Sequence, residues 1–387
     1  MDVLLVCGAA PTFGHPRTHG FIAALARYGH TVTLVFADRA GTTFDDLSRY
    51  CRQVIPVRHR RNLAGVVADL IASERFDLAH LDIRAAMLLG RPLPVPTVVD
   101  AVTCFSRRLE HALRISAPLA RVTRVARLAR IRRQEFRRLA PFEHIILTAE
   151  DDLCALRALG IGETTDAHIY TVPSTLDLQR FAPPLNLREP ATLLLDLRDL
   201  SRSEARHALR LAAATLAIIW RTRPEVRLTV LGASDRRLRS VLTADPRVTF
   251  VNPVRDARIY LTGATLALAP VAPTATTPHS ALEAMATALP LAACERLALD
   301  VGGRDGEELL VAEGPFDLAR ATLVLLNEPP VRGRLGRAAR RLVERRHSWE
   351  LAAIALTDVY AAASGSSLAE WRLQVGLNRP LRAPQSD

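Results

Sequence analysis

Short apolar runs alternate with amphipathic stretches along nearly the whole chain. At the N-terminus, Asp2–Ala9 and Thr31–Ala37 are apolar almost throughout. Between them, Thr18–Tyr28 carries apolar residues at helical spacing and is followed by Gly29. Strands that are apolar on both faces are typical of parallel sheets covered by helices on both sides. The pattern therefore predicts an α/β protein built from βαβ units, with Rossmann-like parallel sheets.

The alternation stops once and begins again. A strand predicted at Ile169–Val172 runs into a proline-containing segment, and a new strand is predicted at Thr192–Leu195. At 387 residues the chain is long enough for two domains of ordinary size. We therefore expect two Rossmann-like halves, residues 1–175 and 176–362, with residues 363–387 as a hinge and tail.

The types of charged residue in the chain exclude several catalytic mechanisms. The chain has 51 basic and 40 acidic residues, a net charge of +11, and every basic residue is Arg. Without Lys, mechanisms that need a Schiff-base or P-loop lysine are excluded. Any cation that holds a phosphate must be Arg, which can donate two parallel hydrogen bonds. The first strand-to-helix turn has no GxGxxG, which argues against a dinucleotide-dependent dehydrogenase.

The cysteines and the apolar runs indicate the cellular compartment of the protein. The five cysteines are scattered and form no CxxC, which predicts free thiols in a reducing compartment and no zinc site. Met1-Asp2 has no basic stretch typical of a secretory signal. Leu211–Trp220 is strongly apolar but too short to span a bilayer. We expect a cytoplasmic protein.

The segment Leu266–Glu295 carries the strongest candidate for a ligand site. A predicted strand at Leu266–Val271 leads through a proline-bracketed loop into a helix, with Thr277 placed to cap it. The free N–H groups and the dipole of a helix N-terminus favour an anion such as phosphate. Glu283 follows one to two turns later, within reach of a sugar hydroxyl beside that phosphate. An ordinary strand-loop-helix crossover explains the segment equally well.

The most basic segment is Arg107–Arg138, with eleven Arg and two Glu. Pro118 is predicted to divide it into two helices, and the second has one apolar face. A solvated helix pair is one interpretation, and a surface that rests on anionic lipid headgroups is another. No aromatic interleaving or zinc spacing supports a nucleic-acid partner.

Several stretches, taken in order, resemble a known enzyme family. They include PTFGHPRTHGFIAALARYGHTVTLV (Pro11–Val35), VPSTLDLQRFAP (Val172–Pro183), LEAMATALPLAA (Leu282–Ala293) and HSWELAAIALTDVY (His347–Tyr360). Together they resemble the family 4 nucleotide-sugar glycosyltransferases. The resemblance implies the GT-B fold, in which two Rossmann-like parallel-sheet domains face each other across a cleft. It makes residues 1–175 the acceptor side and 176–362 the nucleotide-sugar domain, whose last helix (349–362) crosses back.

The resemblance also implies the site residues. Glu283 matches the second Glu of the family's E-x7-E pair and would bind the nucleotide ribose, whereas Ala275 stands where the first Glu is usual. The remaining donor-side candidates, for the diphosphate, are Arg198, Arg202, Thr276, Thr277, His279 and Ser280. The acceptor-side candidates, at strand carboxyl ends or in the first loop, are Gly14, His15, Arg17, Asp82 and Asp100.

The implied activity is a retaining, metal-independent hexosyl transfer from a nucleotide-diphospho-sugar to a glycan, lipid-linked or small-molecule acceptor. No catalytic residue is assigned, and neither a metal nor a cofactor is expected, because the nucleotide sugar is a substrate. The expected process is polysaccharide biosynthesis, and residues 107–138 are the segment through which the protein could attach to the inner face of the membrane. The alternative is a catalytically impaired GT-B scaffold that binds a sugar nucleotide or a partner enzyme without turnover.

Overall fold

The chain divides into two compact units. This computed structural model describes residues 1–11, 16–38, 45–114, 121–184, 190–233, 242, 245–254, 256–273 and 278–365. The first unit comprises Met1–Arg107, Leu119–Val172 and Trp349–Asp387. The second unit comprises Arg108–Pro118 and Pro173–Ser348. The main division thus lies between Val172 and Pro173, three residues before the position expected from sequence, and the C-terminal helix groups with the first unit.

The first unit is built on a seven-stranded parallel sheet. Its strands are β1 (Asp2–Cys7), β2 (Thr31–Ala37), β3 (Gln53–Val57), β4 (Leu78–Asp82), β5 (Thr97–Val102), β6 (His144–Leu147) and β7 (His168–Thr171). They lie in the order β3-β2-β1-β4-β5-β6-β7, and every pairing is parallel. Strand order reverses between β1 and β4, so the carboxyl ends of these two strands flank the switch point of the sheet.

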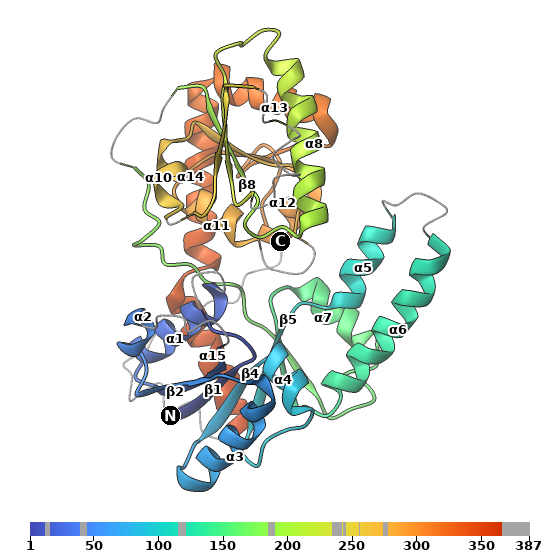
Figure 1. Cartoon of the computed structure of the whole chain (residues 1–387), viewed down its shortest axis with the longest axis vertical. Helices are drawn as coiled ribbons and strands as arrows, with labels where there is room; N and C mark the ends of the chain where they lie inside the picture. Colours follow the sequence, from blue (N-terminus) through green and yellow to red (C-terminus); the bar gives the residue numbers. More distant parts are fainter. Residues whose placement is uncertain are drawn as a thin grey trace. The chain divides into compact units, whose positions relative to one another are not determined.

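Helices cover both faces of this sheet (Figure 1). They are α1 (Pro16–Arg27), α2 (Asp45–Ser48), α3 (Leu63–Ser73), α4 (Ile83–Leu89), α6 (Arg121–Leu139), α7 (Glu150–Arg157) and α15 (Trp349–Ser364). α5 (Phe105–Arg114) begins in this unit, and its residues from Arg108 onward group with the second unit. One core joins α1 and α15 to the sheet, with Phe21, Leu25, Leu356 and Tyr360 buried in it. The other core lies under α3, α4 and α7. The C-terminal helix therefore completes the first unit, although β7 ends at Thr171 and α15 begins only at Trp349.

The second unit repeats the architecture with six parallel strands. They are β8 (Thr192–Asp196), β9 (Arg227–Leu231), β10 (Val248–Val251), β11 (Leu266–Ala269), β12 (Leu291–Ala293) and β13 (Leu310–Val311). Their order is β10-β9-β8-β11-β12-β13, so the switch point lies between β8 and β11. The run of three buried leucines in β8, Leu193 to Leu195, reflects its place at the centre of the sheet.

The helices of the second unit also form two layers (Figure 1). They are α8 (Arg202–Ile219), α10 (Arg258–Gly263), α11 (His279–Ala286), α12 (Glu295–Val301), α13 (Gly314–Asn327) and α14 (Pro329–Arg346). α8 and α13 share one core, and α10, α11, α12 and α14 share the other. α8 begins at a capping box, in which Ser201 accepts from the Glu204 N–H and Glu204 accepts from the Ser201 N–H.

The two all-parallel sheets confirm the α/β class predicted from the apolar runs. Within the segment Leu266–Glu295, the predicted strand is too long by two residues, because β11 ends at Ala269 and not at Val271. The short elements β12, α4 and α12 were not predicted, since three to seven residues carry too little periodicity. Among the described helices, none is both long and apolar enough to cross a bilayer.

Candidate functional site

The centre of the candidate site is an arginine at the end of β8. Arg198 lies two residues beyond Asp196, and its Nε is 3.0 Å from both oxygens of that carboxylate. Its Nη2 donates to Asp196 Oδ2 at 2.6 Å and to Glu283 Oε2 at 2.5 Å. Glu283 comes from α11, 85 residues later in the chain. The structure therefore brings together two of the donor-side residues predicted from sequence.

A glycine makes room for this arginine. Gly232 directly follows β9, with a φ of 81° that favours glycine. A Cβ at Gly232 would lie 3.1 Å from both Cγ and N of Arg198, closer than ordinary contact. Gly232 was not predicted as a site residue, because its importance depends on two loops meeting at the carboxyl edge of the sheet.

The start of α11 is already engaged by an internal carboxylate. The backbone N–H of Ser280 donates to Asp199 Oδ2 at 2.6 Å. Pro278 occupies the N-cap position and makes no side-chain cap bond. Asp199 thus satisfies one of the N–H groups that we expected to face a phosphate. Asp199 was not among the predicted site residues; the available signal was an acidic residue next to Arg198 in a loop that follows a buried strand.

The other donor-side candidates differ in their burial. His279 is the first residue of α11 and is buried. Arg202 is the first residue of α8 and is exposed. Thr276 and Thr277 lie outside the described residues. The structure therefore groups Arg198, Ser280 and Glu283, and adds Asp196 and Asp199 to them.

Burial changes the acidity of the site. It raises the pKa of Glu283 to about 7, although the neighbouring Arg198 acts in the opposite direction. It also raises the pKa of Asp199 to about 6, partly offset by the hydrogen bond from the Ser280 N–H. The negative charge of Asp196 raises both values further. Asp196 and Glu283 share one guanidinium, and burial disfavours the charged forms of Glu283 and Asp199.

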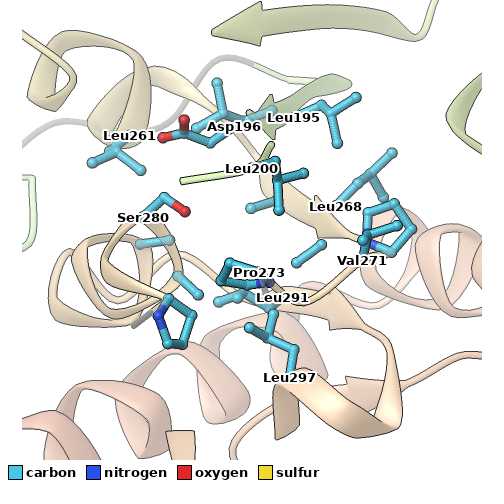
Figure 2. Close-up of a pocket in the computed structure, with 17 residues that line it drawn as sticks. Leu195, Asp196, Leu200, Leu261, Leu268, Val271, Pro273, Ser280, Leu291 and Leu297 are labelled. Atoms are coloured by element: carbon cyan, nitrogen blue, oxygen red, sulfur yellow. The ribbon is translucent and has the colours of Figure 1, made fainter. Parts of the chain in front are cut away.

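A small pocket lies beside this cluster (Figure 2). It is lined by the carboxyl ends of β8 and β11 and by the first turn of α11, which is the switch point of the second sheet. Asp196 and Ser280 lie on one side of it, and Leu268 and Val271 lie on the other. It encloses about 30 Å³, room for one water molecule. Ligands of doubly wound sheets bind at this position.

On the first unit, the predicted acceptor-side residues make internal contacts. Arg17, in the first turn of α1, donates to Asp100 through Nε at 2.7 Å and Nη2 at 3.0 Å, and its Nη1 donates to the Val172 carbonyl at 2.8 Å. The guanidinium also lies 4.4 Å from the centre of the Phe21 ring. Arg17 is only 5% exposed. The structure therefore pairs two predicted residues, Arg17 and Asp100, in a buried contact.

Asp82 caps the N-terminus of helix α4. It is the N-cap of α4, accepting from the Ala85 N–H at 2.6 Å, and it also accepts from the Gly8 N–H at 2.9 Å. Burial raises its pKa to about 6. Asp82 thereby ties the end of β1 to the start of α4 at the switch point of the first sheet. Gly14 and His15 lie outside the described residues.

Helix α6 presents a basic surface. Its one acidic residue, Glu135, is buried and accepts from the backbone N–H groups of Phe105 at 2.6 Å and Ser106 at 3.1 Å. Glu135 therefore stabilises the start of α5 through these two backbone N–H groups. The exposed cations of α6 whose side chains are described are Arg127, Arg130, Arg132, Arg133, Arg137 and Arg138. Within the described part of the chain, no group of His, Cys, Asp or Glu is arranged to hold a metal ion.

A known family of proteins matches part of the second unit. A family model described as "Glycosyl transferases group 1" matches residues 200–328, within the second unit. A comparison with curated proteins finds no match.

Solved structures resemble the whole chain. Sucrose-phosphate synthase from Thermosynechococcus elongatus is 18% identical, with a TM-score of 0.72 over 95% of this chain and 100% of that one. Anabaena Alr3699/HepE in complex with UDP and glucose is 13% identical, with a TM-score of 0.68 over 93% and 99%. A putative UDP-N-acetylglucosamine 2-epimerase from Listeria monocytogenes is 12% identical, with a TM-score of 0.61 over 98% of each chain.

These likenesses show the fold of the chain, and the family model gives the class of its second unit. The expected resemblance is confirmed: the chain has the GT-B fold, and the group 1 domain at residues 200–328 identifies it as a glycosyltransferase.

Proposed function

We propose that the protein transfers a sugar from a nucleotide-diphospho-sugar, with retention at the anomeric carbon and without a metal ion. The observation that carries this proposal is the meeting of Arg198 and Glu283 at the switch point of the second sheet. A cation, a carboxylate and a helix start lie together where such sheets bind phosphorylated ligands. The group 1 match includes Glu283 and supports the same assignment.

Each group has a distinct task in this proposal. Glu283 accepts hydrogen bonds from the ribose hydroxyls, and Arg198 pairs with the diphosphate. The first turn of α11 supplies backbone N–H groups to the same phosphates. In a retaining transfer the departing diphosphate can take the proton from the acceptor hydroxyl, so a second carboxylate, as used by glycosidases, is not required. The acceptor is a glycan, a lipid-linked sugar or a small molecule.

The second candidate is a GT-B scaffold that binds a sugar nucleotide or a partner enzyme without turnover. Two observations favour it. Ala275 stands where such enzymes usually have a Glu, and Arg198 is held by two internal carboxylates. A cation that is already neutralised stabilises a departing diphosphate less than a cation that is not.

The two candidates differ in turnover. Purified protein is tested with UDP-, GDP- and ADP-sugars by thermal shift, and then for release of the nucleoside diphosphate in the presence of lipid-linked and soluble acceptors. UDP-glucose is the first choice, because HepE is described in complex with UDP and glucose. Stabilisation with release supports the transferase, and stabilisation without release supports the scaffold. No stabilisation by any nucleotide sugar contradicts both.

Glu283→Gln provides the matched variant. It keeps the size of the side chain and removes the charge, and we expect donor affinity to fall about tenfold, the loss of one charged hydrogen bond. Glu225→Gln is the control, because Glu225 lies on the same unit and is more than half exposed. Equal affinity in Glu283→Gln and wild type contradicts the ribose assignment.

We also propose that the basic surface of α6 rests on an anionic bilayer. Arg130, Arg133 and Arg137 recur at three- and four-residue spacing and line one groove on the helix. Arg138 Nη1 lies 3.8 Å from the sulfur of Met87, and Met87 and Leu88 are 46% and 43% exposed. Exposed apolar side chains beside arginines favour lipid over nucleic acid, since both can enter the headgroup region.

The lipid contact is tested with vesicles of phosphatidylglycerol and of phosphatidylcholine. Each arginine near an anionic surface contributes about 1 kcal/mol, so the triple change of Arg130, Arg133 and Arg137 to Gln is expected to weaken binding roughly a hundredfold. The control is the triple change of Arg337, Arg341 and Arg345 to Gln, three exposed arginines at similar spacing on α14. Binding that ignores salt, or that falls equally in both triple variants, contradicts the assignment.

A further inference from the structure

The N-terminus of α11 and the arginine beside it are both occupied by carboxylates of the chain itself. Asp199 accepts the Ser280 N–H, and Asp196 and Glu283 share Arg198. Among the described residues, the charged groups that interact with Asp199 are Asp196, at the end of β8, Arg198, on the same loop as Asp199, and Glu283, on α11. When all are ionised, three negative charges meet one positive charge at the place where a diphosphate would bind.

We propose that Asp199 is an internal competitor of the donor diphosphate. In the free protein its carboxylate takes the N–H of Ser280 at the start of α11, and a bound donor replaces it there. Asp199 therefore sets the affinity of this site for nucleotide sugars. The inference rests on the proposed function, because it assumes that a nucleotide sugar binds at the start of α11.

The competition follows from the geometry. A carboxylate and a phosphate each present negatively charged oxygens to the same backbone donor, and one N–H group cannot make a full hydrogen bond to both. At 2.6 Å, the contact between Ser280 N and Asp199 Oδ2 leaves no room for a phosphate oxygen on the line of that bond. Asp199 would also repel the incoming charge, in a site where burial limits screening.

Asp199 differs from an ordinary helix cap. A cap residue precedes its own helix by one position, whereas Asp199 belongs to the loop after β8, 81 residues away from Ser280. Moving this loop releases the N–H of Ser280 without unwinding α11. Arg198 is on the same loop, so a single displacement would free the N–H group and reorient the cation.

The test measures UDP-glucose affinity in Asp199→Asn by calorimetry. The Asn oxygen still accepts the Ser280 N–H, but it carries no charge and is displaced more easily. We expect UDP-glucose to bind about tenfold more tightly than to wild type. Asp199→Ser, which keeps a smaller oxygen acceptor, is the second variant if the first unfolds. Asp245→Asn is the control, because Asp245 lies before β10, at the opposite end of the sheet, paired with Arg247.

A pH series adds a second measurement. Because burial raises the pKa of Asp199 to about 6, lowering the pH from 7.5 to 5.5 protonates a larger share of this carboxyl group and should strengthen UDP-glucose binding to wild type. UDP-glucose is suitable because its diphosphate is esterified at both ends and keeps its charge over this range. Glu283 titrates in the same range, so the difference between wild type and Asp199→Asn isolates the part due to Asp199.

The outcomes separate this inference from the proposed function. Tighter binding in Asp199→Asn, with a weaker pH dependence than wild type, supports the competitor. Equal or weaker binding in Asp199→Asn overturns it and leaves the nucleotide-sugar assignment intact. Binding to neither form, with both folded, overturns the proposed function and the inference with it.

Discussion

Each unit places an arginine against an aspartate near the carboxyl end of its sheet, and the two pairs differ in what surrounds them. In the first unit, Arg17 is 5% exposed, and its guanidinium donates to Asp100 and to the Val172 carbonyl. In the second unit, the side chain of Arg198 is 28% exposed and is divided between Asp196 and Glu283. The first arginine is enclosed by its partners, and the second remains open beside a pocket.

The exposure of the guanidinium distinguishes a structural ion pair from one that can bind a ligand. A buried guanidinium whose partners are all internal cannot exchange them without leaving a charge unpaired, at a cost of several kcal/mol. A partly exposed guanidinium shared by two carboxylates can release one and accept a phosphate at lower cost. The geometry therefore favours a structural role for Arg17 and a ligand-binding role for Arg198. The acceptor role of Arg17 stays a prediction.

The largest expected effect is on the stability of the first unit. Arg17→Met leaves Asp100 buried without its cation, and we expect it to lower the free energy of unfolding by about 3 to 5 kcal/mol. Chemical denaturation measures the change. Adding Asp100→Asn to Arg17→Met removes the uncompensated charge and should restore part of the loss. A loss below about 1 kcal/mol in the single variant would mean that the pair behaves as an exposed one.

A smaller stability effect, with a large binding effect, is expected for Arg198→Met. Water reaches this side chain, and Glu283 can take up a proton when the guanidinium is lost, so we expect a loss of about 1 to 3 kcal/mol. Donor affinity should fall at least tenfold. Arg223→Met is the control, because Arg223 forms a pair with Glu225 on the surface of the same unit. If Arg198→Met costs as much stability as Arg17→Met and leaves nucleotide affinity unchanged, the contrast between the two pairs is wrong.

The sequence was sufficient for the fold and for part of the site. Apolar runs such as those of β1 and β8 predict buried parallel strands, because a strand covered on both faces has no polar side. Glu283 could be found because it follows a helix start and matches the second Glu of the family pattern, and Arg198 because the resemblance points to the loop after the strand at 192–195.

Contacts between distant loops were not predictable in the same way. Asp199 meets Ser280 across 81 residues, and Gly232 matters only because Arg198 packs against it. The closure of Asp100 on Arg17, 83 residues apart, is of the same kind. Local periodicity places each residue on an element. It does not state which loop ends touch when two elements pack.

The smallest expected effect is a pH dependence with opposite signs in the two units. Burial raises the pKa of Glu283 from 4.5 to about 7, so between these values the folded state binds more protons than the unfolded state, and stability falls as pH rises. Burial lowers the pKa of His80, on the first unit, from 6.5 to about 4, so the unfolded state binds more protons and stability falls as pH drops through this range.

Two variants test the sign of the change of stability with pH in each unit. Relative to wild type, Glu283→Gln should become more stable as pH rises from 5 to 7.5, by on the order of 1 kcal/mol, because Arg198 opposes the rise in the pKa of Glu283. Relative to wild type, His80→Gln should gain stability as pH falls from 6.5 to 4.5. Denaturation at four pH values gives both slopes. If the stability of Glu283→Gln and that of wild type change with pH along parallel slopes, the Glu283 carboxyl group stays charged in the folded protein at every pH tested. An incoming diphosphate would then always meet the full negative charge of the site.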